Sequence, residues 1–80
     1  MKVFFQSNVK KELAKYGLNT SFNKACGFIE EGNYKTVDLK LRKPKHLGVY
    51  QFRITKKYRA MAFKEENKLV VYKISDHQEK

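Results

Sequence analysis

The segment Gly48–Phe63, GVYQFRITKKYRAMAF, contains the pattern that decides the fold. From Tyr50 to Thr55 apolar and polar residues alternate, which is the period of a β-strand with one buried face. A second apolar run extends from Tyr58 to Phe63, and the basic pair Lys56-Lys57 separates the two. We therefore expect two antiparallel strands joined by a tight turn.

The length of this turn decides where Arg53 and Arg59 lie. A two-residue turn of Lys56 and Lys57 would place the two arginines on opposite faces of the sheet. A three-residue turn of Thr55–Lys57 with a bulge would place Arg53 directly opposite Arg59, on the same face. The pattern favours the longer turn, because neither lysine readily adopts the positive φ that a two-residue turn demands. Two arginines so placed repel each other, and we expect an anion between them.

The rest of the chain extends this hairpin into an α+β domain. Periodicity and end signals predict a strand at Lys2–Phe5, a helix from Ser7 or Asn8 to Gly17, a helix from Thr20 or Ser21 to Gly32, a strand at Val37–Leu41 that ends at Pro44, and a last strand at Leu69–Ile74. The order is β-α-α-β-β-β-β within a single domain, residues 1–80. We expect two N-terminal helices packed on one face of a mostly antiparallel twisted sheet, with Gln51 and Arg53 on its open face.

Positive charge is concentrated in the middle of the chain. The sequence has 18 Lys and Arg against 8 Asp and Glu. Ten of the basic residues lie between Tyr34 and Lys64 with one acid, Asp38, so this segment carries +9 of the net +10. Such a segment indicates a polyanionic partner, which is nucleic acid, an acidic membrane surface or an acidic protein. The alternative is a solvated face that is basic only for solubility.

Several classes of protein are excluded by composition. The single Cys26 excludes a disulfide framework and a zinc finger, and we interpret it as a small buried hydrophobic residue. We expect no metal and no cofactor, no membrane-spanning segment and no signal peptide, and hence a cytoplasmic location.

Two histidines and two arginines are the candidates for chemistry. Metal-free RNA cleavage needs a base for the 2′-hydroxyl, an acid for the departing 5′-oxygen and a fixed cation for the phosphorane charge. His46 and His77 can exchange protons near neutral pH, and Arg53 and Arg59 suit phosphate oxygens.

The segment Gly48–Arg59, together with LVVYKISDH at Leu69–His77, resembles the RelE/ParE toxin superfamily of type II toxin–antitoxin systems. The shared pattern is Gly-x-aromatic, an Arg-Ile in one strand, a Tyr-Arg that opens the next, and a last strand ending near a His. The motifs are most similar to YoeB-like and RelE-like mRNA interferases. The resemblance implies a RelE-like fold and a ribosome-dependent, metal-independent mRNA endonuclease that inhibits translation through 2′-hydroxyl attack on the adjacent phosphodiester.

The resemblance also implies residue roles. Arg59 matches the arginine that stabilises the transition state, Arg53 a phosphate-contacting position, and His77 the general acid. YoeB-like enzymes carry a glutamate base before the Gly-x-aromatic, whereas Lys40–His46 contains no acid. The proton chemistry is therefore left open among Lys45, His46 and Asp76.

We expect three kinds of partner: the ribosome, its mRNA, and a cognate antitoxin with an acidic, partly disordered segment. The residues expected to contact the ribosome and mRNA are Lys43, Lys45, His46, Gln51, Lys56, Lys57 and Lys73. Two other functions remain open. One is a ParE-like toxin that poisons DNA gyrase without cleavage, and the other is a non-catalytic RNA-binding module.

Overall fold

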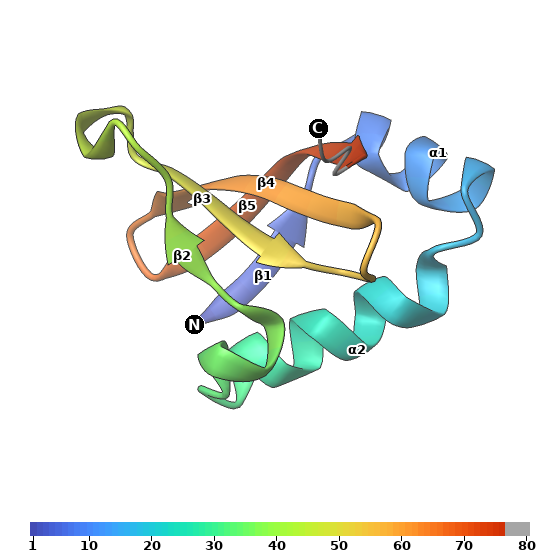
Figure 1. Cartoon of the computed structure of the whole chain (residues 1–80), viewed down its shortest axis with the longest axis horizontal. Helices are drawn as coiled ribbons and strands as arrows, with labels where there is room; N and C mark the ends of the chain where they lie inside the picture. Colours follow the sequence, from blue (N-terminus) through green and yellow to red (C-terminus); the bar gives the residue numbers. More distant parts are fainter. Residues whose placement is uncertain (77–80) are drawn as a thin grey trace.

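The computed structural model describes residues 1–76. Its elements are β1 (Lys2–Phe5), α1 (Ser7–Lys15), α2 (Asn19–Glu30), β2 (Lys40–Leu41), β3 (Val49–Arg53), β4 (Tyr58–Glu65) and β5 (Lys68–Asp76), with short 3₁₀ turns η1 (Tyr34–Val37) and η2 (Lys45–Leu47) (Figure 1). This confirms the α+β class and the predicted order of helices and strands.

The strands form one five-stranded sheet in the order β1-β5-β4-β3-β2. β1 pairs with β5 in parallel, and the other three pairs are antiparallel. The two helices carry the chain from β1 at one edge of the sheet to β2 at the other, and the meander β2-β3-β4-β5 then returns to pair with β1. The sheet is therefore mostly antiparallel, as predicted.

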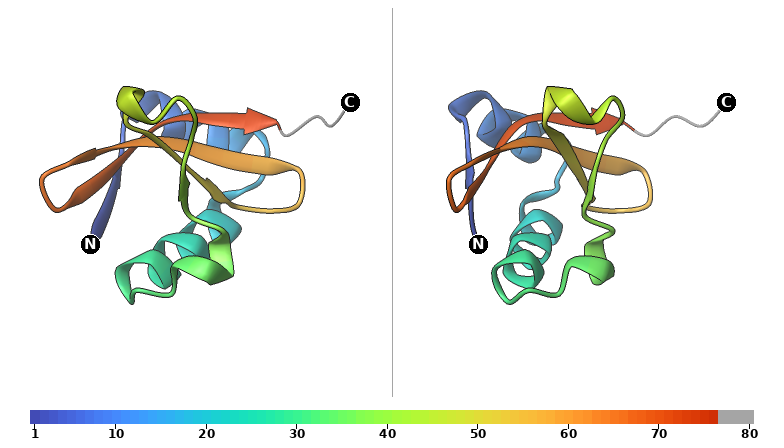
Figure 2. Two further views of the ribbon diagram at one scale, coloured as in Figure 1. Left: turned by 60° about the vertical axis from the view of Figure 1, so that its left-hand side comes forward. Right: turned by 90° about the vertical axis from the view of Figure 1, so that its left-hand side faces the viewer.

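Helix α2 covers one face of this sheet, and the core lies between them (Figure 2). The fully buried large side chains come from the helices and the sheet: Val9 from α1, Phe22 and Ile29 from α2, Phe52 from β3, and Leu69 and Val71 from β5. The rings of Phe22 and Phe52 have centroids 6.2 Å apart. The loop that follows β2 lies on the opposite side of the sheet (Figure 2), and we call that side the open face.

Helix α1 lies along the outer edge of β5, where β1 no longer pairs. The main-chain N–H of Ile74 donates to Oε1 of Glu12 at 3.2 Å, and Nδ2 of Asn8 donates to the Tyr72 carbonyl at 3.1 Å. These side chains serve strand groups that would otherwise be unpaired, which protects an exposed sheet edge. Both helices contribute side chains to one core. The sequence predicts both on one face of the sheet, because helical periodicity shows that α1 has an apolar side but not whether that side packs on the face or at the edge.

Two predicted boundaries were wrong. The strand predicted at Val37–Leu41 is reduced to the two residues of β2, because Val37 belongs to η1 and Asp38 adopts a left-handed conformation with φ of 54°. The second helix begins at Asn19 after Leu18, without a side-chain cap from Thr20 or Ser21. Leu18 is buried in the core, so packing rather than capping fixes this start.

Candidate nucleic-acid interface

Arg53 of β3 lies directly opposite Arg59 of β4. The main-chain N–H groups of Ile54 and Thr55 both donate to the Tyr58 carbonyl, at 3.0 and 3.2 Å. The turn is therefore the three-residue Thr55–Lys57 alternative. Because directly paired residues project from the same side of a sheet, both arginine side chains leave the backbone on the open face.

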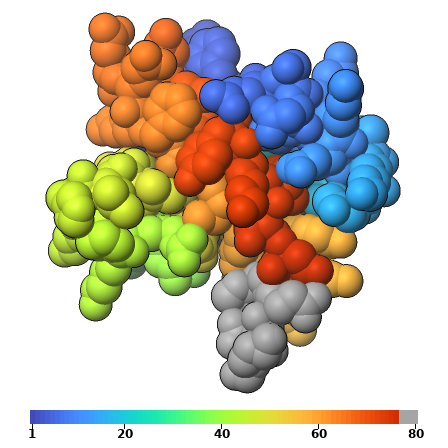
Figure 3. Space-filling view, turned by 90° about the horizontal axis from the view of Figure 1, so that it is seen from above, coloured from blue at the N-terminus to red at the C-terminus, as the bar shows by residue number. Residues whose placement is uncertain are grey.

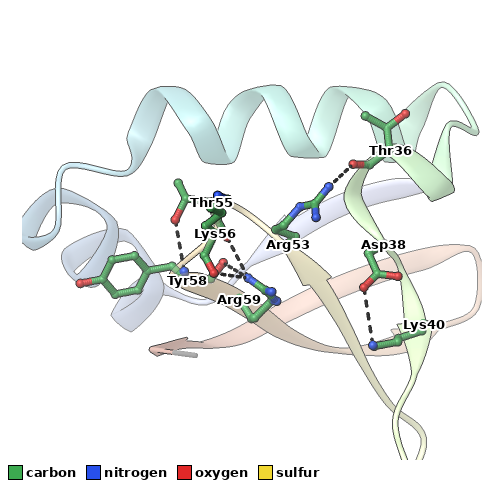
Figure 4. A network of polar contacts seen from close by, with 8 residues as sticks. All are labelled: Thr36, Asp38, Lys40, Arg53, Thr55, Lys56, Tyr58 and Arg59. Carbon is green, nitrogen blue, oxygen red and sulfur yellow. Dashed lines mark hydrogen bonds and ion pairs between the residues drawn. The ribbon is translucent and has the colours of Figure 1, made fainter. Parts of the chain in front are cut away.

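The two guanidinium groups then turn apart (Figure 4). Nη2 of Arg53 donates to the Thr36 carbonyl at 3.1 Å. Nη1 of Arg59 donates to the carbonyls of Thr55 at 2.8 Å, Lys56 at 3.0 Å and Tyr58 at 3.4 Å. The expected anion between the arginines is therefore not required, since backbone carbonyls compensate each positive charge separately.

The surroundings of the two arginines differ. Arg53 is exposed and lines a hollow of about 230 Å³ between α2 and η1, with Lys24 and Phe28 among the other lining residues. Arg59 is half-buried, and within residues 1–76 all its side-chain hydrogen bonds use Nη1. The rest of its planar fork is thus left for a ligand, held in place by its own turn.

A second row of side chains crosses the open face beside the arginines. Gln51 of β3 pairs with Met61 of β4, which pairs with Lys73 of β5. Gln51 is half-buried and Lys73 is exposed. These two predicted contact residues therefore share one face with the arginine row, which continues from Arg59 to Ser75.

The remaining predicted contact residues fall into two groups at opposite ends of β3. Lys43, Lys45 and His46 are exposed in the loop that contains η2, before β3 begins. Lys56 and Lys57 are exposed in the turn after β3 ends. At about 3.3 Å per residue, the five residues of β3 separate the two groups by roughly 15–20 Å.

This separation bears on the candidates for proton transfer. Asp76 pairs with Tyr58, so it lies at the same end of the sheet as Arg59. Lys45 and His46 lie at the other end. His77 falls outside the described residues. Asp38 forms an ion pair with Lys40, with Oδ2 and Nζ 3.5 Å apart.

Sequence analysis missed an aromatic pair on the open face. Phe63 of β4 and Tyr72 of β5 stack with ring centroids 6.1 Å apart. A register shift makes Met61 pair with Lys73 but Ala62 pair with Val71, so Tyr72 is the extra residue of a bulge. The available signal was a break in alternation: Val71 and Ile74 are three positions apart, which would place them on opposite faces of a regular strand, yet both are buried.

Cys26 on α2 is half-buried beside the core. Burial, and secondarily the negative charge of Glu30, raises the pKa of its thiol to about 12. The protonated thiol is a poor nucleophile. This agrees with the interpretation of Cys26 as a packing residue.

Comparison of the chain with models of known protein families gives no match, and no curated protein matches it either. In the described part of the chain, no helix has the length and apolar character needed to cross a bilayer. Nor do three His, Cys, Asp or Glu side chains come together as a metal site anywhere in residues 1–76.

Proposed function

We propose that this protein is the toxin of a type II toxin–antitoxin system and acts as a ribosome-dependent mRNA endonuclease. The observation that carries the proposal is the Arg53–Arg59 pair across a three-residue turn, whose side chains leave the backbone on the open face of a basic sheet although the Arg53 guanidinium turns toward η1 and α2. The sequence resemblance predicted this pair as the phosphate-binding centre, and the alternative turn would have separated the two side chains.

Arg59 is the better placed of the two for the transition state. Three carbonyls fix its guanidinium before substrate arrives, so little reorganisation is needed when charge develops on the phosphate. Arg53 lies at the margin of the sheet, held by Thr36, and suits a neighbouring phosphate. Because guanidinium forks bind phosphate oxygens in pairs, Arg59 can bind the scissile phosphate through the donors that its turn does not use.

The reaction itself balances without a metal. A base takes the 2′-hydroxyl proton, the 2′-oxygen attacks phosphorus, and the bond from phosphorus to the 5′-oxygen breaks as an acid protonates that oxygen. The products are a 2′,3′-cyclic phosphate and a 5′-hydroxyl. Asp76 shares an end of the sheet with Arg59, but it pairs with Tyr58 and leaves the backbone on the opposite face, so the base stays open among Lys45, His46 and Asp76. His77 is assigned as the acid by resemblance.

A non-catalytic RNA-binding module is the second candidate. The observation in its favour is the divergence of the two guanidinium groups, each already bonded to backbone. Such arginines still contribute positive charge to an RNA-binding surface. A ParE-like gyrase poison is the third candidate and needs no cleavage centre.

A pulse of expression in bacteria distinguishes these candidates. The proposal expects protein synthesis to stop first, with mRNA cut only where ribosomes are engaged. Relaxation of plasmid supercoiling before any mRNA is cut would support the ParE-like gyrase poison. Arrest with intact mRNA and normal supercoiling would support RNA binding alone.

The proposed antitoxin supplies a second test. A chain with a net charge of +10 favours an acidic, partly disordered segment that folds on binding. Its association rate should fall as salt is raised, because electrostatic steering is screened. An association rate independent of salt would contradict capture by charge.

A further inference from the structure

The bulge in β5 places an aromatic ring where a regular strand would not. Tyr72 is half-buried, and its ring stacks on Phe63. Asn8 fixes the main chain at this position by donating to the Tyr72 carbonyl at 3.1 Å. The ring is therefore supported from one side by Phe63, while its backbone is held by α1.

A hollow of about 210 Å³ opens beside this ring on the open face. It is lined by Arg42, Lys43, Pro44, Leu47, Val49, Met61 and Tyr72. Figure 3 looks onto this face, with the loop before β3 on one side and the end of β5 toward the centre. The lining residues combine an aromatic ring and apolar side chains with two positive charges and no carboxylate.

Arg42 contacts Met61, another of the residues that line the hollow. Its Nη1 approaches Sδ of Met61 to 3.9 Å, so the side chain reaches from the loop across β3 to β4. A sulfur atom is a weak acceptor, and it leaves most of the hydrogen-bonding capacity of the guanidinium unused. Lys43 is exposed beside it.

We propose that this hollow binds one base of single-stranded RNA, stacked against Tyr72, with the flanking phosphates held by Arg42 and Lys43. Single-stranded nucleic acid is bound by this combination of aromatic platform and basic rim. The hollow is smaller than the roughly 300–1,000 Å³ typical of small-molecule pockets, which suits a single planar group. The choice of RNA as ligand rests on the proposed function.

The proposed subsite on β5 lies close to the proposed cleavage centre on β4, on the same face of the sheet. Tyr72 precedes Ser75, the residue opposite Arg59, by three positions. At about 3.3 Å per residue this is roughly 10 Å along β5. A base bound at Tyr72 would thus position the backbone of the same RNA strand relative to Arg59.

The test measures binding without ribosomes, so that it is independent of cleavage. A fluorescently labelled ten-nucleotide RNA is titrated into the wild type and into Tyr72→Leu, Tyr72→Phe and Tyr34→Ala. Tyr72→Leu removes the aromatic ring and should weaken binding about 5- to 150-fold, the range expected for one lost base–aromatic stack. Tyr72→Phe should bind as the wild type does. Tyr34→Ala removes an exposed tyrosine from η1 and should also have no effect.

A second measurement needs only the wild type. An RNA carrying 2-aminopurine loses fluorescence when that base stacks on an aromatic ring, and the proposal expects such quenching on binding. Unquenched 2-aminopurine, or equal RNA affinity in folded Tyr72→Leu, would overturn the subsite. So would a Tyr72→Leu variant that loses affinity for an acidic peptide but keeps it for RNA. If the RNA base does not stack on Tyr72 but the protein still cleaves mRNA, the subsite is wrong and the proposed function stands. If the base stacks on Tyr72 but no mRNA is cleaved, the proposed function is wrong and the subsite stands.

Discussion

Arg53 and Arg59 are paired across two strands, but their guanidinium groups are bonded in opposite directions. One reaches the Thr36 carbonyl and the other returns to the carbonyls of Thr55 and Lys56 (Figure 4). Two like charges therefore occupy one row of the sheet, each with its own acceptors. We therefore expect the two residues to differ in their contributions to stability and to cleavage.

The first prediction concerns the fold of the turn. Arg59→Ala should lower the free energy of unfolding by about 1–2 kcal/mol, since the carbonyls of the turn lose a charged, partly exposed donor. Arg53→Ala is the matched control and should cost less, because Arg53 is exposed and makes one such bond. Urea denaturation of both variants measures the difference. An equal or larger loss in Arg53→Ala would contradict the structural role of Arg59.

A second prediction concerns the edge of β5. Glu12→Ala removes the acceptor for the Ile74 N–H and should cost about 1–2 kcal/mol, as expected for a bond to a charged group. Glu12→Gln keeps an acceptor oxygen and should recover most of this loss in the same urea titration. If Glu12→Gln is as unstable as Glu12→Ala, the hydrogen bond is not what holds α1 to the sheet.

The third prediction follows from the pKa of Cys26, which rises from 9.0 to about 12 on folding. Between these pH values the unfolded chain releases the thiol proton while the folded chain keeps it. The unfolded state then binds fewer protons, so stability contributed by this group falls as pH rises above 9. Cys26→Ala should unfold with a shallower loss of stability between pH 8 and pH 10 than the wild type. If the stability of the two proteins falls equally between pH 8 and pH 10, the raised pKa of Cys26 is contradicted.

How far the sequence alone predicts this structure depends on whether the deciding interaction is local. The alternation from Tyr50 to Thr55 and the poor fit of two lysines to a tight turn were enough to predict the arginine register. The two-residue β2 and the position of α1 were not predictable in this way. They depend on the backbone of Asp38 and on the hydrogen bond that Glu12 accepts from Ile74, 62 residues away.

The candidate site was predicted only in part for the same reason. Side-chain type and spacing identified the arginines, but the carbonyls that hold Arg59 become neighbours only when the turn closes. The bulge at Tyr72 depends on how β4 and β5 align, which no single strand encodes. A residue pattern predicts on which face of a sheet a side chain begins, but not which groups the end of a long side chain contacts.

The fourth prediction separates the two basic groups from background charge. Replacement of Lys43 and Lys45 by Gln, or of Lys56 and Lys57 by Gln, should weaken ribosome binding. Each lost phosphate contact should reduce the slope of log affinity against log salt by about 1. Gln at Lys10 and Lys11, exposed on α1, is the control pair. An equal effect of the control pair would show that only net charge matters.

The fifth prediction concerns the two histidines. In single-turnover cleavage at saturating protein, His77→Ala should lose a factor of about 10² to 10⁴ if it protonates the leaving oxygen. His46→Ala should affect binding more than the chemical step, since His46 lies at the far end of β3 from Arg59. The reverse outcome would move the acid to the basic loop.

The central claim is cleavage of mRNA on the ribosome, centred on Arg59. The direct measurement is single-turnover cleavage of an mRNA on programmed ribosomes, with Arg59→Ala compared with the wild type and with Lys11→Gln. We expect the wild type and Lys11→Gln to cut at the same rate, and Arg59→Ala to be slower by about 10² to 10³, as for the loss of one preorganised charge-stabilising group. An mRNA left intact by the wild type, or cut by folded Arg59→Ala at the wild-type rate, would contradict the claim.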